Sequence, residues 1–252
     1  MIEIRQVSHR IGGTPILSDI DVTIPKGGIT ALIGPNGAGK STLLGLVARL
    51  ERLQAGRIAV DGLDVARTPT DRLARTLAIL RQDGTVAARL TVRDLVGFGR
   101  YPHHKGWPGP ADRDAVEEAL EAFDLAPLGT RFVDTLSGGQ RQRAMVAMTY
   151  AQGTDYILLD EPLNNLDLAH ARALMQRLRG MADRHGRTIV VVLHEVNYAA
   201  HYADRIIGLR DGRIAAQGPA PEVLTEPTLS SLFGSPVRLG RVGEHTVVLH
   251  HA

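Results

Sequence analysis

The sequence reads Gly34-Pro35-Asn36-Gly37-Ala38-Gly39-Lys40-Ser41-Thr42 where an apolar run meets an amphipathic segment. Residues 34–41 fit the phosphate-loop pattern G-x-x-x-x-G-K-[ST]. The run of residues 29–33 before the loop predicts a short buried strand, and apolar residues between 43 and 50 recur at helical spacing. We therefore expect the loop at a helix N-terminus, where free backbone N–H groups and the helix dipole favour anions.

This motif predicts a cradle for a nucleoside triphosphate. Its glycines let backbone N–H groups curl around the phosphates, Lys40 can bridge the outer two phosphates, and the Ser41 hydroxyl can hold Mg²⁺. The alternative is a glycine-rich turn that matches the pattern by accident. The strand and helix patterns on either side of the loop disfavour that alternative.

The composition bounds the class of protein. With 252 residues and 44% hydrophobic content, the chain can form one large domain, so we expect one nucleotide site per chain. Lysine and arginine (29) nearly balance aspartate and glutamate (27), and cysteine is absent, which excludes disulfides and thiolate metal sites. The N-terminus lacks the pattern of a signal peptide, and no apolar run approaches the roughly 20 residues of a membrane span. A soluble protein, or one peripheral to a membrane, is expected.

The chain divides into segments of different character. Residues 2–33 alternate apolar segments with turns, which predicts a partly antiparallel sheet leading into the phosphate loop. Residues 84 to about 135 contain two helical patterns separated by the loop 101–110, so we expect an inserted helical lobe. Its clearest helix is expected to follow Asp112 or Asp114 as N-cap.

Polar residues follow several of the strands that are predicted after residue 76. Strand 77–80 leads to Gln82, the apolar run 156–159 ends in Asp160 and Glu161, and strand 188–193 ends at His194. The carboxyl ends of strands are where open α/β sheets bind ligands, so these side chains are expected to meet there.

The order of these motifs resembles the ATP-binding subunit of ABC transporters over residues 1 to about 220. Besides the phosphate loop, the resemblance rests on Gln82, Leu136-Ser137-Gly138-Gly139-Gln140, Asp160-Glu161, Leu166-Asp167 and His194. It implies an α/β fold, a P-loop NTPase ABC cassette with a RecA-like core and an antiparallel β subdomain. The helical subdomain would be inserted at about 84–148, and residues 221–252 would form a C-terminal extension packed on the core.

The resemblance also implies a hydrolytic mechanism with ATP and Mg²⁺. Phosphoryl transfer to water requires neutralised charge on the γ-phosphate, a bound metal and an oriented water. Lys40 would supply charge, while Ser41, Asp160 and Gln82 would hold the metal directly or through water. Glu161, expected to point away from Asp160 on a strand, would be the general base. His194 would contact the γ-phosphate and orient the water, although a lone histidine is more often structural.

Residues 137–140, called the signature segment below, form a second predicted anion site at a helix N-terminus. In the family this segment closes over the nucleotide of the opposite subunit, so two copies enclose two ATP molecules. Asp167 would lie at that dimer seam, and it can also be the N-cap of the following helix. Where an aromatic residue usually stacks on adenine, this chain has Ile11 with Arg10 nearby, so apolar contact or a guanidinium face would hold the base.

Three segments narrow the resemblance to importers of iron–siderophore complexes, close to the haem and vitamin B12 importers: residues 96–102, 141–144 and 161–167. The implied partners are a second copy, transmembrane permease subunits and, indirectly, a substrate-binding protein, at the cytoplasmic side of the cell membrane. The lobe between Gln82 and Trp107 is the expected permease contact. The exposed aromatics Phe98, Tyr101 and Trp107 could instead pack within the lobe.

Two other function classes compete with this interpretation. A soluble ABC ATPase acting on nucleic acid usually carries two cassettes or a long coiled-coil insertion, and this chain has neither, so no nucleic-acid partner is expected. An exporter commonly has its cassette fused to the membrane domain, and no membrane segment is predicted here. A haem or vitamin B12 importer remains the nearest alternative, because no residue singled out here contacts the cargo.

Overall fold

The computed structural model of the protein describes residues 1–82 and 89–249. Its strands are β1 (Ile2–Ile11), β2 (Thr14–Ile24), β3 (Gly28–Ile33), β4 (Ala55–Val60), β5 (Leu63–Asp64), β6 (Leu77–Leu80), β7 (Tyr156–Asp160), β8 (Thr188–Val192), β9 (Arg205–Arg210), β10 (Arg213–Pro219), β11 (Arg238–Val242) and β12 (His245–Leu249). Its helices are α1 (Lys40–Val47), α2 (Thr70–Ala74), α3 (Val92–Phe98), α4 (Tyr101–His104), α5 (Pro110–Ala122), α6 (Gly138–Ala151), α7 (Leu168–His185), α8 (Val196–Tyr202), α9 (Ala220–Val223) and α10 (Glu226–Phe233).

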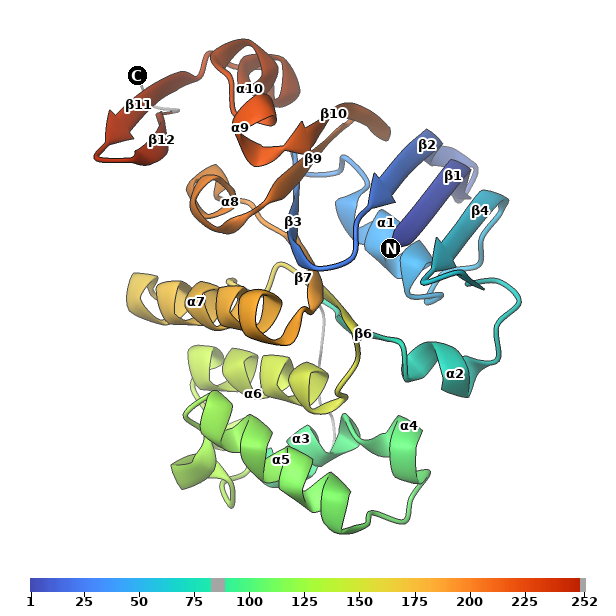
Figure 1. Ribbon diagram of the computed structural model, residues 1–252, viewed down its shortest axis with the longest axis vertical. Coiled ribbons are helices and arrows are strands. Elements are labelled where there is room, and N and C mark those ends of the chain that lie inside the picture. The colour runs from blue at the N-terminus through green and yellow to red at the C-terminus, as the bar shows by residue number, and fades with distance from the viewer. Residues whose placement is uncertain (83–88, 250–252) are drawn as a thin grey trace.

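A six-stranded sheet with the order β10-β9-β3-β8-β7-β6 forms the centre of the molecule (Figure 1). Strands β6, β7, β8, β3 and β9 run parallel, and β10 pairs antiparallel at the edge. Every residue of β7 and β8 is buried, as expected for parallel strands covered on both faces. Because these strands are parallel, the residues that follow β3, β6, β7 and β8 gather at one edge of the sheet.

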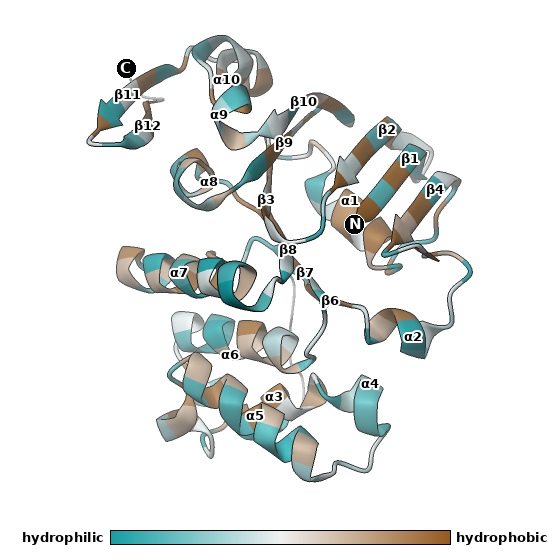
Figure 2. Cartoon of the chain, viewed as in Figure 1, coloured by the Kyte–Doolittle hydropathy of each residue, from teal (hydrophilic) through white to brown (hydrophobic). Residues whose placement is uncertain are grey.

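A second, antiparallel sheet has the order β2-β1-β4-β5 and packs over α1. Its inner face is apolar, and Figure 2 shows hydrophobic residues in brown at intervals along β1 and β2. Alternation along β1 puts Ile2 and Ile4 inside, and a register shift between Ile4 and Val7 brings Val7 to the same face. The predicted antiparallel sheet ahead of the phosphate loop is confirmed.

Helices α3 to α6, here called the helical lobe, pack around Leu120, Phe123 and Val96 (Figure 1). The predicted start of its clearest helix after Asp112 or Asp114 is wrong, because α5 begins at Pro110 with Gly109 as N-cap. Proline at the first helical position is favoured by its fixed φ. Asp112 instead accepts the Gly109 N–H within the first turn and pairs with Arg100. The expected boundary at residue 84 lies outside the described residues.

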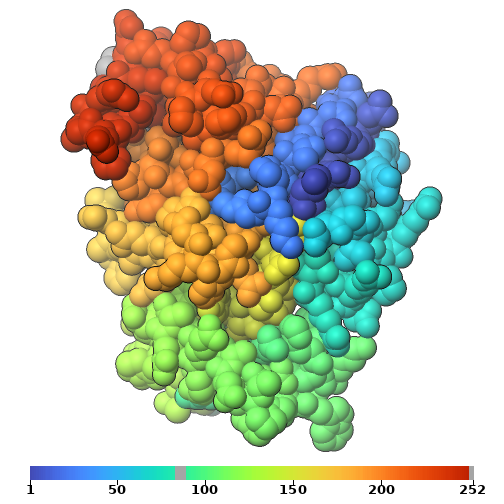
Figure 3. Space-filling model, viewed as in Figure 1, coloured from blue at the N-terminus to red at the C-terminus, as the bar shows by residue number. Residues whose placement is uncertain are grey.

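The chain ends in a hairpin of β11 and β12 that packs on α8, at the end of the molecule opposite the helical lobe (Figure 3). The side chain of Asn197 in α8 accepts the Val248 N–H at 2.8 Å and donates to the Val248 carbonyl at 3.2 Å. A short helix, α10, precedes the hairpin in the sequence. Within the described residues, every helix is too short or too polar to cross a membrane.

Acidification is expected to loosen this hairpin. His201 in α8 and His245 in β12 have ring centroids 4.5 Å apart. Burial, followed by the charges of His245 and Arg172, lowers the pKa of His201. The stability that depends on a neutral His201 is therefore fully present above the unfolded pKa of about 6.5 and is lost as the pH falls below it.

The measurement is amide hydrogen exchange in residues 245–249 at pH 5 and pH 7, corrected for intrinsic exchange rates. Faster corrected exchange is expected at pH 5, and His201→Gln should reduce the difference because the glutamine does not titrate. An equal difference in that variant would assign the effect to other groups.

Candidate active site

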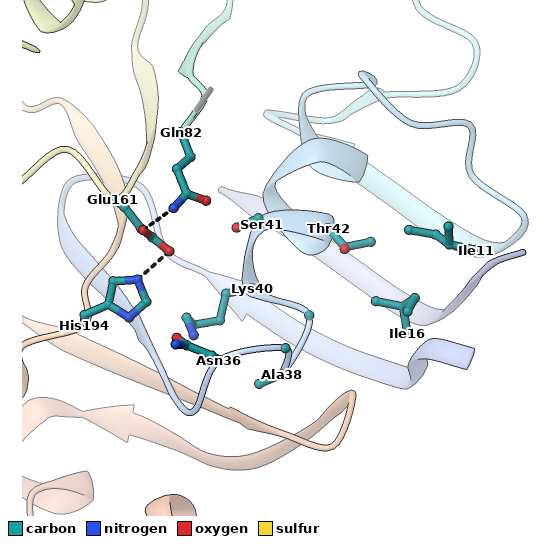
Figure 4. A pocket seen from close by; sticks show the side chains of 12 residues that line it. Ile11, Ile16, Asn36, Ala38, Lys40, Ser41, Thr42, Gln82, Glu161 and His194 are labelled. Carbon is teal, nitrogen blue, oxygen red and sulfur yellow. Dashed lines mark hydrogen bonds and ion pairs between the residues drawn. The ribbon is translucent and has the colours of Figure 1, made fainter. Parts of the chain in front are cut away.

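A cavity of about 410 Å³, here called the nucleotide cavity, opens above the carboxyl ends of the central strands. Figure 4 shows Lys40, Gln82, Glu161 and His194 gathered at one end and Ile11 and Ile16 at the other. The lining residues are Ile11, Ile16, Asn36, Gly37, Ala38, Gly39, Lys40, Ser41, Thr42, Gln82, Glu161 and His194. Segments that are far apart in the sequence thus line the nucleotide cavity together, because the strands that lead to them are neighbours in the central sheet.

The phosphate loop occupies the turn between β3 and α1, as predicted. Gly34 has φ +142°, and a Cβ there would overlap the carbonyl oxygen of Leu209. Gly39, the N-cap of α1, has φ +95°, and its Cβ would lie 2.6 Å from Leu17 Cδ2. Both positions therefore require glycine, and both hold the loop close to its neighbours. The free N–H groups of the first turn of α1 are left available to an anion.

Lys40 is a buried cation, with only 5% of its surface exposed. Its Nζ donates to the carbonyl oxygens of Gly34 at 2.8 Å and Pro35 at 2.9 Å, so the ammonium is held inside the loop. Burial lowers the pKa of Lys40, while the nearby carboxylates of Glu161 and Asp160 oppose that shift. A buried ammonium group beside the free backbone N–H groups of the loop favours binding of an anion such as phosphate.

Asp160 lies at the end of β7, buried beneath the loop, where its Oδ1 accepts the Ser41 hydroxyl at 3.0 Å. Burial raises the pKa of Asp160 more than the hydrogen bond from Ser41 lowers it. A cation would offset this cost, and a hydroxyl beside a carboxylate is a donor set that Mg²⁺ accepts. Among the residues described, no group of three or more His, Asp or Glu gathers.

Glu161 is a buried carboxylate of the cavity, with 8% of its surface exposed. Its Oε1 lies 2.5 Å from His194 Nε2, and its Oε2 accepts hydrogen bonds from Gln82 Nε2 and Asn164 Nδ2, each at 2.6 Å. The sequence predicted that strand alternation separates Glu161 from Asp160. The strand ends at Asp160, however, and Glu161 has φ +52°, so a left-handed turn and not alternation directs its side chain.

The opposite end of the cavity is apolar. Ile11 ends β1, with 53% of its surface exposed, and Ile16 of β2 lies near it (Figure 4). Sequence reasoning named Ile11 but missed Ile16. The pairing of β1 and β2 shifts between His9↔Leu17 and Arg10↔Pro15, so Ile16 occupies a β-bulge. Bulges redirect side chains and leave no clear sequence signal.

The signature segment lies away from the nucleotide cavity of its own chain. Ser137 is the N-cap of α6, and it shares a capping box with Gln140: its Oγ accepts the Gln140 N–H at 3.2 Å, and Gln140 Oε1 accepts the Ser137 N–H. Ser137 and Gly138 are exposed to solvent. Asp167 is likewise exposed, and it caps α7 by accepting the His170 N–H at 2.8 Å. The predicted N-cap role of Asp167 is thus confirmed.

Comparison with known proteins places this fold and cavity in a family. The sequence model of the family described as ABC transporter matches residues 17–164. The petrobactin import ATP-binding protein of Bacillus anthracis is 45% identical, over 95% of this chain and 96% of that protein. The iron(3+)-hydroxamate import ATP-binding protein of Bacillus subtilis is 41% identical, over 90% of this chain and 86% of that protein.

Solved structures agree with the sequence relatives. One is a dimeric ATP-binding cassette in a post-hydrolysis state, bound to ADP and Pi, with a TM-score of 0.79 and 26% identity. The match covers 87% of this chain and 99% of that one. The fold, the phosphate loop and the sequence relatives together lead to one conclusion: the chain belongs to the ABC transporter family and is an ATP-binding cassette ATPase.

Proposed function

We propose that this protein is the ATP-hydrolysing subunit that energises import of an iron–siderophore complex through a membrane permease, at the cytoplasmic side of the membrane. The observation that carries the proposal is the convergence of Lys40, Glu161 and His194 on one cavity beside the phosphate loop. The relatives named above are import ATP-binding proteins for petrobactin and iron(3+)-hydroxamate. We assign residues 1–220 to the cassette, with a helical subdomain at about 84–148, and 221–252 to an extension.

The phosphate loop, Gly34 to Thr42, binds the phosphates in this mechanism, and Lys40 neutralises the outer two. Mg²⁺, held by Ser41, Asp160 and Gln82 directly or through water, supplies further positive charge. Ile11 and Ile16 contact the base by apolar packing, because they line the end of the cavity opposite Glu161. Two of the three N–H donors of the buried Lys40 ammonium already bond to carbonyl oxygens, so the third is the donor that is free for a bound phosphate.

Glu161 accepts a proton from the attacking water in this proposal. It follows Asp160 directly but is turned by its left-handed backbone, so the two carboxylates serve the water and the metal separately. His194, 2.5 Å from Glu161, orients that water and contacts the γ-phosphate. Holding these groups in place supplies most of the catalysis, since phosphoryl transfer depends on positioning and charge more than on covalent chemistry.

Two copies are needed for a complete site in this scheme. The signature segment is exposed and outside its own nucleotide cavity, so it is free to cover the nucleotide of a second copy. Asp167, at the exposed start of α7, lies at the seam between the copies. The dimeric structure of a related ATP-binding cassette, bound to ADP and Pi, supports this arrangement.

Ser137→Arg tests the second half of the site. The bulky cation replaces the N-cap at the start of α6 and blocks approach of a partner's nucleotide, so ATP turnover should fall by at least about tenfold while binding of one ATP per chain persists. Turnover and dimer formation are measured by phosphate release and light scattering. The control is Ser231→Arg, because Ser231 is exposed to solvent. The neighbouring Ser230 is unsuitable, because its Oγ accepts the Val237 N–H. Normal turnover in Ser137→Arg would remove the signature segment from the mechanism.

A groove on the helical lobe is the proposed permease contact. It encloses about 650 Å³ among residues of α3, α4 and α5, including Phe98 and Tyr101. Phe98 (53% exposed), Tyr101 (57%) and Trp107 (89%) are not packed inside the lobe, which removes that alternative. Exposed aromatic residues beside an apolar groove are typical of protein contact sites.

The cargo is tested with the complete transporter. The protein is purified with its permease, placed in vesicles and supplied with a binding protein loaded with one ferric siderophore at a time. Stimulation of ATP hydrolysis by a ferric siderophore is expected. Stimulation by haem or vitamin B12 alone would assign the chain to the alternative importers, and stimulation by nucleic acid without the permease would remove it from transport.

A further inference from the structure

Asn164 lies in the turn that follows Glu161, and its side chain contacts the Glu161 carboxylate. Its Nδ2 donates to Glu161 Oε2 at 2.6 Å, and its backbone N–H donates to the Glu161 carbonyl at 3.3 Å. Both contacts occur within the tight turn that starts with the left-handed Glu161. Asn164 therefore makes two hydrogen bonds to Glu161 within this turn, one from its backbone and one from its side chain.

The three donors to Glu161 differ in where they come from. Gln82 follows β6, and His194 follows β8, so both belong to other strands and also line the nucleotide cavity. Asn164 lies three residues from Glu161 and moves with it. A nucleotide competes for Gln82 and His194, which face it, and leaves Asn164 as the donor that stays with the carboxylate.

Asn164 also approaches Glu161 from the side away from the nucleotide. A second cavity of about 230 Å³, the rear cavity, is lined by Asn164 together with Glu161 and His194. Glu161 and His194 line both cavities, whereas Asn164 lines only the rear one. A hydrogen bond from behind fixes Oε2 and leaves Oε1 on the His194 side of the carboxylate.

The turn that carries Asn164 is itself fixed against the start of α6. Gln142 Nε2 donates to the Pro162 carbonyl at 3.1 Å. A Cβ added to Gly138 would lie 3.4 Å from Asn165 Cβ, and one added to Gly139 would lie 3.3 Å from Leu166 Cδ2. The signature helix and the glutamate turn are therefore in close contact within one chain.

We propose that Asn164 is a positioning residue, whose side-chain amide orients the Glu161 carboxylate for hydrolysis without contacting the nucleotide. This inference rests on the proposed role of Glu161 as the base. Asn164→Ala should lower kcat for ATP about 10- to 100-fold, the usual cost of losing a group that orients a reacting side chain, and leave KM within about threefold. Asn164→Asp keeps the size of the side chain but removes the donor, so it should lose at least as much.

The experiment measures steady-state ATP hydrolysis, nucleotide affinity and thermal unfolding of the full chain. Asn197→Ala is the matched control, because Asn197 also makes two side-chain hydrogen bonds, but to the C-terminal hairpin. That control should lower the melting temperature and leave kcat unchanged. In single-turnover measurements, adding Asn164→Ala to Glu161→Gln should cause no further loss, since the carboxylate to be oriented is gone.

Two results would overturn the inference. Native kcat in Asn164→Asp would show that the residue only fills space, and an equal loss in the Glu161→Gln background would show that it acts independently of Glu161. The proposed function fails separately: if Glu161→Gln alone hydrolyses ATP at the native rate, the base assignment is wrong whatever Asn164 does.

Discussion

The Glu161→Gln variant is expected to bind ATP as tightly as the native chain and to hydrolyse it at least about 100-fold more slowly. Glutamine has nearly the same shape as glutamate but cannot accept a proton from water. Its carbonyl oxygen can take the place of Oε2 and accept hydrogen bonds from Gln82 and Asn164, while its NH2 group faces His194 Nε2, which accepts in the other neutral tautomer, so the cavity should keep its form. Binding and chemistry should therefore separate in this variant.

If Glu161 is the base, as proposed, its removal should also trap the ATP-bound dimer, because hydrolysis is the step that reopens the proposed dimer. Phosphate release, ATP titration and gel filtration with and without ATP measure the three effects. Glu121→Gln, at an exposed position of α5, is the control for loss of one carboxylate and should behave as the native chain. Unchanged hydrolysis by Glu161→Gln in the reconstituted transporter would refute the base assignment.

Lys40→Met is expected to weaken ATP binding by about 10- to 100-fold, because a hydrogen bond to a charged group contributes about 1.5–3 kcal/mol. Methionine fills much of the same space, but it cannot bridge the phosphates or bond to Gly34 and Pro35. Loss of those two internal bonds should loosen the loop as well, so turnover should be lost together with affinity.

Titration calorimetry with ATP and Mg²⁺ measures the affinity. Lysine occurs at three positions in this sequence, and Lys26 provides the matched control. Lys26 is half-exposed and pairs with Asp155 and Asp61 outside the nucleotide cavity, so Lys26→Met should bind ATP normally. Equal affinity in Lys40→Met and Lys26→Met would show that the buried cation does not contact the phosphates.

Sequence patterns predicted those parts of the molecule that depend on local chemistry. The phosphate loop between a strand and a helix, the helix that starts at the signature segment and the N-cap Asp167 follow from residue type and spacing. The meeting of Gln82, Glu161 and His194 followed from a general property of parallel sheets, since their strands end at one edge.

The features that were missed depend on backbone irregularity or on contacts within turns. Ile16 reaches the cavity through a register shift, and Glu161 points into it through a left-handed φ that no alternation rule includes. The start of α5 at Pro110 was missed because acidic residues suit both an N-cap and a first turn. Asn164 could have been considered from its distance of three residues to Glu161, but only coordinates place its amide against the carboxylate.

The position of β3 in the central sheet has a consequence for how the chain folds during synthesis. Gly28 pairs with Thr188, and Thr30 pairs with Arg205, so the strand that carries the phosphate loop has both its neighbours near the other end of the chain. While the ribosome makes the helical lobe, this apolar strand has neither partner. Contacts of such long sequence separation form late and slowly. The sheet that holds the phosphate loop can therefore form only after β8 and β9 have been synthesised, and until then both edges of β3 lack a partner.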